Sequence, residues 1–525
     1  MFWADRIADQ IKNTVTPRAG VGKPLLIRDE KTVSGKVHVG SMRGVAIHGA
    51  LSSTLSHMGV LNEFKYEMND FDPFDGLPLY LDKEIYGPLL GGQLYKIPSP
   101  DPSFNNFADL NAAEFEKVIT DTGYYPTFYR SKDLYLSGQM DEAIRLVLTK
   151  ADRIREIYKE VSGSQRVSEW LPISVICENC GKVSMTQASD FDGNTVAYTC
   201  AIDAVKWGVG CGHMGRVSPF GGRAKLPWKP EWAAKWFVLG VDVEGAGKDH
   251  STKGGAREVA NAIAKEVFNI EPPFDVPYEF FLVGGQKMAS SKGRGSSARD
   301  VADLIPPKIF RLALLGKEIN QAFNFDPAGE TIPTLYDQYD KFADSYAEGV
   351  RDDYSRLFLL VENNLEGEPT IPFRVRFSQV AFISQMPHMD LKKEAELLKG
   401  SSLSELDLEE LAERAAYAKH WLSTAAPEKY RFALYESLPP LAAELTDEQK
   451  KALSSIADLL EKNPDALVLH EQIHALKDSL GISPKELFSA VYMVFLNKKE
   501  GPKAGWFIAT LDREFALKRL KEASV

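Results

Sequence analysis

The sequence predicts a parallel α/β sheet that is interrupted by an inserted module and followed by an all-α C-terminal domain. Three observations predict this fold class. Residues 24–70 read as strand, loop, helix and strand, all four cysteines lie between residues 177 and 211, and helical periodicity dominates from about residue 298 onward. A strand–helix–strand opening favours a parallel sheet, because parallel neighbours need a crossover connection between them.

The opening of the sheet is predicted element by element. An apolar run at 24–27 is the first strand, and a loop rich in Gly, Ser and Thr follows at 32–35. A helix pattern then runs from 39 to about 58, and the second strand covers 63–68. The second strand ends in two acids, Asp70 and Asp72. Ligands bind at the carboxyl ends of such strands, so both acids are candidate site residues.

The remaining elements follow the same order of reasoning. A charged helix is expected at 139–160, a helix at 231–236, a strand at 237–243, a helix at 252–268 and a strand at 279–283. Residues 75–130 contain several Pro and Gly breaks and look irregular. The expected domains are a split α/β catalytic domain at 1–90 and 226–297, an insertion at 91–225 with a cysteine-rich module at about 171–216, a helical junction at 298–345 and an α-helical domain at 346–525.

Length and composition limit the class of protein. The chain has 525 residues, and one hydrophobic core rarely grows past about 250–300 residues, so several domains are expected. Hydrophobic residues make up 44% and charged residues 26%, which argues against long disorder. The net charge of −11 counts mildly against a nucleic-acid binder, so any nucleic acid should meet a local basic face.

Targeting signals are not expected. The first residues, MFWADRIADQIKNT, have helical spacing and acids rather than the apolar segment of a secretory signal. No apolar run is long enough to span a membrane. Four cysteines in so long a chain favour a reducing compartment, so a cytoplasmic protein is expected.

The HVGS motif at 38–41 stands at the start of the first predicted helix. A helix N-terminus offers unpaired N–H groups and a positive dipole end, which suit phosphate. Gly40 allows close approach of a nucleotide, and His38 can donate to an α-phosphate as charge develops. The alternative is a surface histidine at a helix N-terminus, since this motif alone is weak.

The KMASSKG motif at 287–293 follows the last predicted strand. Two lysines flank two hydroxyls, and glycines with Arg294 stand behind them. This composition is typical of a loop that closes over a triphosphate, although a solvated basic loop is a common alternative. The two motifs at opposite ends of one α/β domain form a stronger signal than either one.

The GKDH motif at 247–250 lies between a predicted strand and a helix. Asp249 can hold ribose hydroxyls, and His250 can line a pocket for a second substrate. An ordinary helix cap is the equal alternative.

The cysteines are Cys177, Cys180, Cys200 and Cys211, with His213 close behind. Four soft donors that include one CxxC pair suit a structural zinc ion in tetrahedral coordination. The other two cysteines, Cys200 and Cys211, do not form a second CxxC pair, so four buried thiols are the alternative. Cys211 is favoured over His213 as the fourth ligand.

These motifs together make the chain resemble the class I lysyl-tRNA synthetases over essentially its full length. The resemblance depends on TVSGKVHVGSMRG (32–44), NDFDPF (69–74), CENCG…CGH (177–213), LPWKPEW (226–232), WFVLGVDVEGAGKDH (236–250), YEF (278–280), KMASSKG (287–293) and GPKAGWFIATLDREFALKRL (501–520). It implies a Rossmann-type catalytic domain with an inserted zinc-binding module and an all-α anticodon-binding domain.

The resemblance also implies a reaction and its site residues. Lysine and Mg-ATP would form lysyl-adenylate, and the lysyl group would pass to the 2′-hydroxyl of the terminal adenosine of tRNA-Lys. Catalysis would rest on His38, Lys287 and Lys292. ATP would be bound by His38, Gly40, Ser41, Gly247, Asp249, Lys287, Met288, Ser290, Ser291 and Lys292. L-lysine would be bound by Thr32, Phe74, Trp228, His250 and Tyr278, with Asp70 or Asp72 facing its ε-ammonium.

Three residues depart from the pattern of the family. Ser41 stands where class I enzymes have a second histidine, and Ser290 stands where they have an inner lysine. Glu30 stands where this family usually has a small residue beside the amino acid. Two alternatives therefore stay open: a class I ligase for another amino acid, and a non-catalytic tRNA-binding protein of the same fold.

Overall fold

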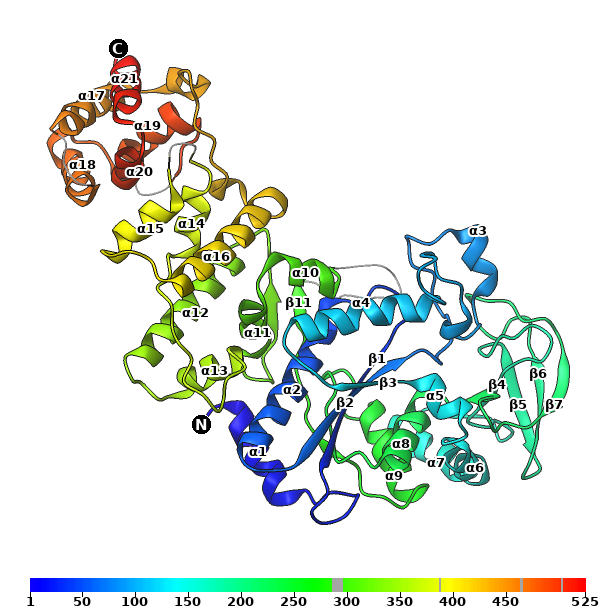
Figure 1. Ribbon diagram of the computed structural model, residues 1–525. Helices are drawn as coiled ribbons and strands as arrows, with labels where there is room; N and C mark the ends of the chain where they lie inside the picture. Colours follow the sequence, from blue (N-terminus) through cyan, green and yellow to red (C-terminus); the bar gives the residue numbers. More distant parts are fainter. Residues whose placement is uncertain (286–295, 387–388, 463–465, 502–503) are drawn as a thin grey trace. The chain divides into compact units, whose positions relative to one another are not determined.

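A computed structural model of the chain describes residues 1–285, 296–386, 389–462, 466–501 and 504–525 (Figure 1). Its backbone falls into two compact units. The first, called here the α/β unit, comprises residues 1–325 and 345–369, and the second, the helical unit, comprises residues 326–344 and 370–525. The predicted combination of a parallel α/β sheet and a helical C-terminal region is confirmed.

The centre of the α/β unit is a five-stranded sheet in the order β10-β9-β1-β2-β3, and all of its pairings are parallel. Strand β1 is in register with β2 along its whole length, from Leu25 opposite Asn62 to Thr32 opposite Asn69. Its strands are β1 (Leu25–Thr32), β2 (Asn62–Asn69), β3 (Thr127–Arg130), β9 (Val243–Glu244) and β10 (Phe274–Asp275).

The two faces of strand β1 meet different helices. Because successive side chains of a strand point to opposite faces, Asp29 reaches His48 of α2 (Met42–His57), while Glu30 reaches Lys235 of α8 (Trp228–Leu239). Figure 1 shows α2 and α8 on either side of β1 and β2. The helices of this layer and its surroundings are α1 (Trp3–Thr14), α4 (Phe107–Asp121), α5 (Ser131–Leu136), α6 (Asp141–Thr149), α7 (Ala151–Ser162) and α9 (Ala256–Glu266).

Several predicted elements differ from the structure. The strand expected at 237–243 is wrong for residues 237–242, because α8 continues to Leu239 and β9 begins only at Val243. Trp232 and Trp236 stand one helical turn apart on this helix, and their buried rings pack with a centroid distance of 5.4 Å. The helix expected at 139–160 is two helices, α6 and α7, with a break at Lys150.

The limits of the sheet and of the units also differ from the expected domain boundaries. Strand β3 pairs with β2 although it lies inside the range expected for the insertion. The strand expected at 279–283 is β11 (Phe281–Val283), which pairs in parallel with β12 (Phe323–Phe325) outside the main sheet. Helix α13 (Asp353–Val361) groups with the α/β unit, whereas the sequence suggested a boundary at residue 346. Two further helices of this unit are α10 (Ala298–Leu304) and α11 (Pro307–Leu315).

The cysteine-rich module contains two small antiparallel sheets. Strands β5 (Thr186–Phe191), β6 (Val196–Cys200) and β7 (Met214–Val217) form one, and β4 (Ser174–Val175) pairs with β8 (Ala224–Lys225) in the other. Its buried side chains share one hydrophobic cluster with α6, α7, α8 and α9. The module is therefore packed on the helices beside the main sheet.

The helical unit has its own core. Buried Leu, Ile, Val, Ala and Phe side chains of its last five helices form one cluster. Outside this cluster, the fully buried Arg414 of α16 (Glu405–Thr424) is compensated by ion pairs with Asp340 and, at 2.7 Å, with Glu410. Its helices are α12 (Thr331–Ala347, continuing into the other unit), α14 (Phe377–Ile383), α15 (Leu391–Lys399), α16 (Glu405–Thr424), α17 (Asp447–Glu461), α18 (Ala466–Leu480), α19 (Pro484–Leu496), α20 (Ala504–Thr510) and α21 (Arg513–Ala523).

Candidate active site

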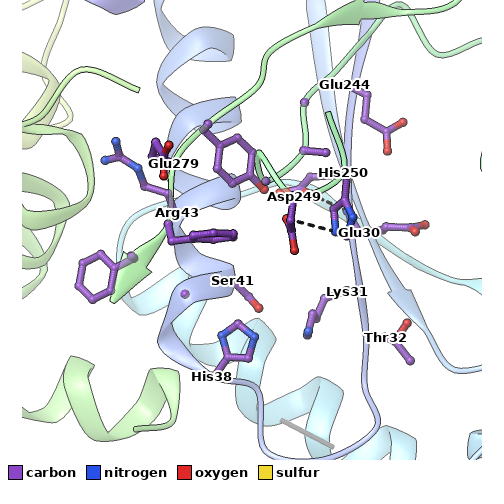
Figure 2. Close-up of a pocket in the computed structure, with 18 of the residues that line it drawn as sticks. Glu30, Lys31, Thr32, His38, Ser41, Arg43, Glu244, Asp249, His250 and Glu279 are labelled. Atoms are coloured by element: carbon purple, nitrogen blue, oxygen red, sulfur yellow. Dashed lines mark hydrogen bonds and ion pairs between the residues drawn. The ribbon is translucent and has the colours of Figure 1, made fainter. Parts of the chain in front are cut away.

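A pocket of about 320 Å³ opens at the carboxyl ends of β1 and β9, where the sheet predicts a ligand site (Figure 2). Four segments line it, and they are far apart in the sequence. They are residues 29–32 at the end of β1, residues 38–43 at the start of α2, residues 244–250 after β9, and residues 278–281; Tyr66, Trp228 and Trp232 complete the wall.

The HVGS segment forms a short 3-10 turn, η1 (Val39–Ser41), that leads into α2. Residues 296–298 hold this segment, since Val39 N–H donates to Ser296 O at 3.2 Å and Ala298 N–H donates to Val37 O at 2.8 Å. Gly40 fits closely here, since a Cβ at this position would lie 3.0 Å from the His38 ring and 3.3 Å from Phe281 O, tighter than ordinary contact. His38, Gly40 and Ser41 all line the pocket.

The GKDH segment lies across the pocket and is fixed by residue 278. Lys248 N–H donates to Tyr278 O at 2.9 Å, and Tyr278 N–H donates to Ala246 O at 3.1 Å. The His250 ring meets the Trp228 ring edge-on at 4.8 Å. Gly247, Asp249, His250, Trp228 and Tyr278 therefore share one pocket with Thr32, although the sequence spreads them over more than two hundred residues.

Beside the pocket, β1, β2, β9 and α8 share a set of buried charges, called here the buried charge network. Its centre is Arg28, which is fully buried and donates to Glu244 at 2.6 Å, to Glu67 at 2.5 Å and to Glu30. Lys235 meets the same acids, Glu67 at 2.5 Å and Glu30 at 3.1 Å. The full network is Arg28, Glu30, Glu67, Asp72, Lys225, Glu231, Lys235 and Glu244.

This network holds five acids and three bases, so acids are in excess. Burial raises the pKa of Glu244, and the Arg28 guanidinium opposes that rise only in part. Burial also raises the pKa of Glu231. By contrast Glu67 has two cations beside it: burial would raise its pKa, but Lys235 and Arg28 hold it well below the usual range. Glu244, which lines the pocket, is therefore a network acid that an added cation would stabilise.

Two acids and one aromatic residue predicted for the amino-acid pocket do not line it. Asp70 is fully buried, its Oδ1 accepts from the Lys132 backbone at 2.8 Å, and burial raises its pKa. Asp72 accepts from Thr32 Oγ1 at 2.7 Å and pairs with Lys225 at 2.9 Å. Phe74 is fully buried against Phe107. These residues follow β2, one strand away from the pocket, and the sequence alone could not separate the two strand ends.

Other pocket residues were not singled out by the sequence analysis. The charged ones are Asp29, Lys31, Arg43, Glu244 and Glu279. A signal was present in β1, because Arg28, Asp29, Glu30 and Lys31 are four consecutive charges in a strand at the centre of a sheet. Such strands are normally apolar, so charges there point to a site. Lys287, Met288, Ser290, Ser291 and Lys292 lie outside the residues that the structure describes.

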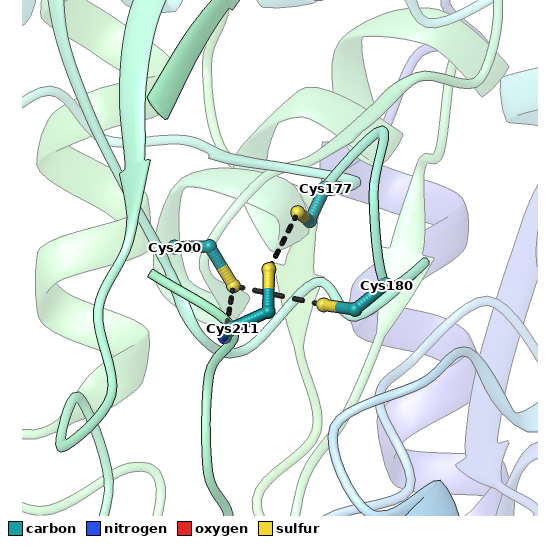
Figure 3. Close-up of side chains that lie close together, drawn as sticks. All are labelled: Cys177, Cys180, Cys200 and Cys211. Atoms are coloured by element: carbon teal, nitrogen blue, oxygen red, sulfur yellow. Dashed lines mark hydrogen bonds between the residues drawn. The ribbon is translucent and has the colours of Figure 1, made fainter. Parts of the chain in front are cut away.

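The four cysteines come together in the module (Figure 3). Their sulfur atoms all lie within 4.8 Å of one another, with Cys177 Sγ 3.6 Å from Cys211 Sγ and Cys180 Sγ 3.7 Å from Cys200 Sγ. Tetrahedral zinc–thiolate bonds of about 2.3 Å require S···S separations of about 3.8 Å, so the set fits zinc. His213 is not a member of this group. Hydrogen bonds from Asn179 and His213 lower the pKa of Cys211 to about 6, which favours the metal-binding thiolate.

Within the part of the chain that the structure describes, every helix is too short or too polar to cross a lipid bilayer.

Comparison with known proteins adds an independent observation. The family model of the tRNA synthetases class I (K) matches residues 1–362. The lysine–tRNA ligase of Methanosarcina barkeri strain Fusaro is 32% identical over 548 residues, which covers 100% of this chain and 98% of that protein. The lysine–tRNA ligase of Archaeoglobus fulgidus is 31% identical and covers 100% of both chains. A glutamate tRNA ligase structure from Elizabethkingia meningosepticum covers 96% of this chain and 99% of its own at 12% identity and a TM-score of 0.43, a likeness too low to carry an argument.

Proposed function

The chain belongs to the tRNA synthetases class I (K), and from that premise we propose that it is a lysine–tRNA ligase that uses ATP to join lysine to tRNA-Lys. One observation carries this proposal. The HVGS and GKDH segments of a chain that matches lysine–tRNA ligases over its full length line a single pocket at the carboxyl edge of a parallel sheet.

The proposed reaction has two steps. A carboxylate oxygen of lysine attacks the α-phosphorus of Mg-ATP, and pyrophosphate leaves with the electron pair of the broken P–O bond. The 2′-hydroxyl of the terminal adenosine of tRNA then displaces AMP from lysyl-adenylate. Mg²⁺ neutralises charge on the phosphates in the first step. The protein's own contribution is to position the reactants and stabilise charge at phosphorus.

The ATP side of the pocket is assigned to η1 and to the segment after β9. His38 would donate to the α-phosphate, while Gly40 and Ser41 leave room for phosphate at the helix start. Gly247 and Asp249 would hold the ribose. Lys287 and Lys292, with Met288, Ser290 and Ser291, would supply the loop that faces the departing pyrophosphate.

The lysine side is assigned to Thr32, Trp228, His250 and Tyr278. The aromatic rings suit the aliphatic stem and the ammonium of lysine. Among the pocket acids, Glu30 is the best placed for the ε-ammonium. Its Oε2 accepts from Arg28 and Lys235, no described residue bonds its Oε1, and an added ammonium would offset the excess of acids in the network. Glu30 thus replaces Asp70 and Asp72 in this role.

A structural zinc ion is proposed for the module. The four thiolates Cys177, Cys180, Cys200 and Cys211 would complete its coordination, which leaves no open position for catalysis.

The helical unit is proposed to hold the anticodon of tRNA-Lys. Its support is the family membership and the separate core of residues 326–344 and 370–525. Photocrosslinking of tRNA-Lys to the full chain should label peptides from 370–525; labelling confined to the α/β unit would contradict this assignment.

The test of the function is ATP–pyrophosphate exchange with each of the twenty amino acids, followed by charging of tRNA-Lys. Lysine should give the fastest exchange. A different preferred amino acid would support the second candidate, a class I ligase for another substrate. If no amino acid supported exchange, the remaining candidate would be a non-catalytic tRNA-binding protein of the same fold.

The variant His38→Ala tests the chemistry. It should lower exchange by about 10²–10³-fold, because one positioned transition-state donor is removed. Binding of tRNA should stay near the value of the unsubstituted chain, and an equal loss of both would indicate misfolding instead.

A further inference from the structure

The pocket contains a cation whose role the proposed function leaves open. Its basic side chains, histidines aside, are Lys31 and Arg43. Arg43 is fully buried and is held by backbone carbonyls, since it donates to Leu314 O and, at 3.2 Å, to Glu318 O. No hydrogen bond or ion pair joins the Lys31 ammonium to any residue within the described ranges. Lys31 is therefore the pocket cation that is available to a ligand.

The position of Lys31 on β1 directs it toward one side of the pocket. Side chains alternate along the strand, so Asp29 and Lys31 share the face toward α2, while Glu30 and Thr32 share the face toward α8. Figure 2 shows Lys31 extending toward His38, with Glu30 and Thr32 on the other side of the strand. The ammonium thus lies on the side assigned to phosphate and away from the aromatic residues assigned to the lysine substrate.

The surroundings keep this ammonium short of charge compensation. Burial lowers the pKa of Lys31 below that of an ordinary lysine, and the nearby acids Asp29 and Glu30 oppose the change only in part. Both acids have other partners: Asp29 accepts from the Glu30 N–H at 2.8 Å, and Glu30 is held by Arg28 and Lys235. A partly buried cation without its own counter-ion is stabilised by binding an anion.

We propose that Lys31 binds the α-phosphate of ATP together with His38 and stabilises the negative charge that develops there as lysyl-adenylate forms. The proposal rests on the proposed function. It also accounts for a feature of the sequence, because KMASSKG has Ser290 where class I enzymes have an inner lysine, and Lys31 supplies a pocket ammonium from a different strand. Lys31 stays protonated throughout and donates N–H to a non-bridging oxygen, so no proton changes hands.

The test compares Lys31→Met, Lys31→Arg and the matched control Lys36→Met in the full chain. Lys36 lies five residues further on, does not line the pocket, and holds its ammonium 5.8 Å from the centroid of the Tyr80 ring. Calorimetric titration with Mg-ATP, AMP and adenosine separates phosphate contacts from contacts to the nucleoside.

Lys31→Met should weaken binding of Mg-ATP and AMP by about 10-fold or more and leave adenosine binding unchanged, because one charge-assisted hydrogen bond is lost. Lys31→Arg should retain most of the affinity, and Lys36→Met should match the unsubstituted chain. Equal weakening of all three ligands would mean that the pocket has collapsed, and it would overturn the proposal. Unchanged ATP binding with tighter lysine binding would also overturn it, since Lys31 would then merely occupy the amino-acid site.

These titrations measure binding and do not require turnover. Their outcome therefore does not depend on whether the proposed function is correct. A chain that exchanges no amino acid would refute the ligase, yet it could still show the phosphate-dependent loss at Lys31. In an active chain, Lys31→Met should lower kcat for exchange with little change in KM for lysine.

Discussion

The buried charge network and the cysteine cluster are both dense groups of titratable side chains in the α/β unit, but they are completed in different ways. In the network each charged group has an opposite charge from the same chain, such as Arg28 with Glu67 at 2.5 Å and Lys225 with Glu231 at 2.5 Å. The four cysteines instead face one another, with sulfur atoms at 3.6 and 3.7 Å. The network thus finds its counter-ions within the protein, although acids are in excess, whereas the cluster is proposed to be completed by a metal ion.

The two groups also differ in how far apart their members are in the sequence. The cysteines lie between residues 177 and 211, and the network draws on residues 28 to 244. The difference teaches that a local set of donors is visible as a motif, while a non-local set is visible only after the strands have paired.

The largest expected effect comes from removing the zinc ion proposed for the cysteine cluster. Chelation, or Cys177→Ser, should reduce bound zinc from about one ion per chain to almost none and unfold residues 174–217, because structural zinc contributes about 10 kcal/mol or more to such modules. Elemental analysis and hydrogen exchange of β5–β7 measure both outcomes. His213→Ala is the control and should keep its zinc. If that variant lost its zinc, the fourth ligand would be His213 rather than Cys211.

The second-largest expected effect tests how strongly a buried cation of the network stabilises the fold. Lys235→Met should lower the free energy of unfolding by about 3–5 kcal/mol, because Glu67 and Glu30 lose a buried cation. Urea unfolding followed by hydrogen exchange in β1 and β2 is the measurement. Lys65→Met is the control, since Lys65 only pairs with Glu63 at 3.4 Å on the surface. A loss below about 1 kcal/mol for Lys235→Met would mean that the network is no more than a surface-like cluster.

The third effect is a pH dependence of the network. Lys235 and Arg28 hold the folded-state pKa of Glu67 well below its usual range despite burial, so its carboxylate stabilises the fold at neutral pH. This stabilisation is present above the unfolded-state pKa and is lost as pH falls through that value toward the folded-state pKa. Denaturation between pH 7 and 3 should therefore show a stability gap between the unsubstituted chain and Glu67→Gln that narrows with acid. A constant gap would contradict the role of the charge.

The smallest expected effect is at Arg153, which lies in an exposed cluster of charges that can be compared with the buried network. Arg153 meets Glu156 at 2.7 Å, Glu160 at 3.0 Å and Glu266 at 2.5 Å, as many acids as Arg28 does. These acids are exposed, so Arg153→Ala should cost only about 0–1 kcal/mol in urea unfolding. A cost near that of Lys235→Met would show that burial is not what separates the two clusters.

Much of the lining of the candidate pocket was predictable, and the predictions of lining residues that proved wrong share one cause. His38, Gly40 and Ser41 lie in a continuous motif at a helix start, and Gly247, Asp249 and His250 lie in another, so their common pocket follows from the rule on strand ends. Asp70 and Asp72 satisfied the same rule one strand away, where Lys132 and Lys225 compensate them. Choosing between adjacent strand ends requires the positions of cations that are distant in sequence.

The sequence by itself determined the parallel α/β sheet, the helical C-terminal region, the family and the grouping of four cysteines, because periodicity, turn residues and short motifs are local properties of the chain. Only the tertiary structure decided that β3 belongs to the main sheet and that Arg28 and Lys235 share the acids of β1 and β2. It also decided that Lys31 lines the pocket with no hydrogen bond or ion pair to its ammonium from the described residues. These are facts about burial and charge pairing across 39 to 216 residues of sequence, and electrostatic free energy depends on distance in space rather than along the chain.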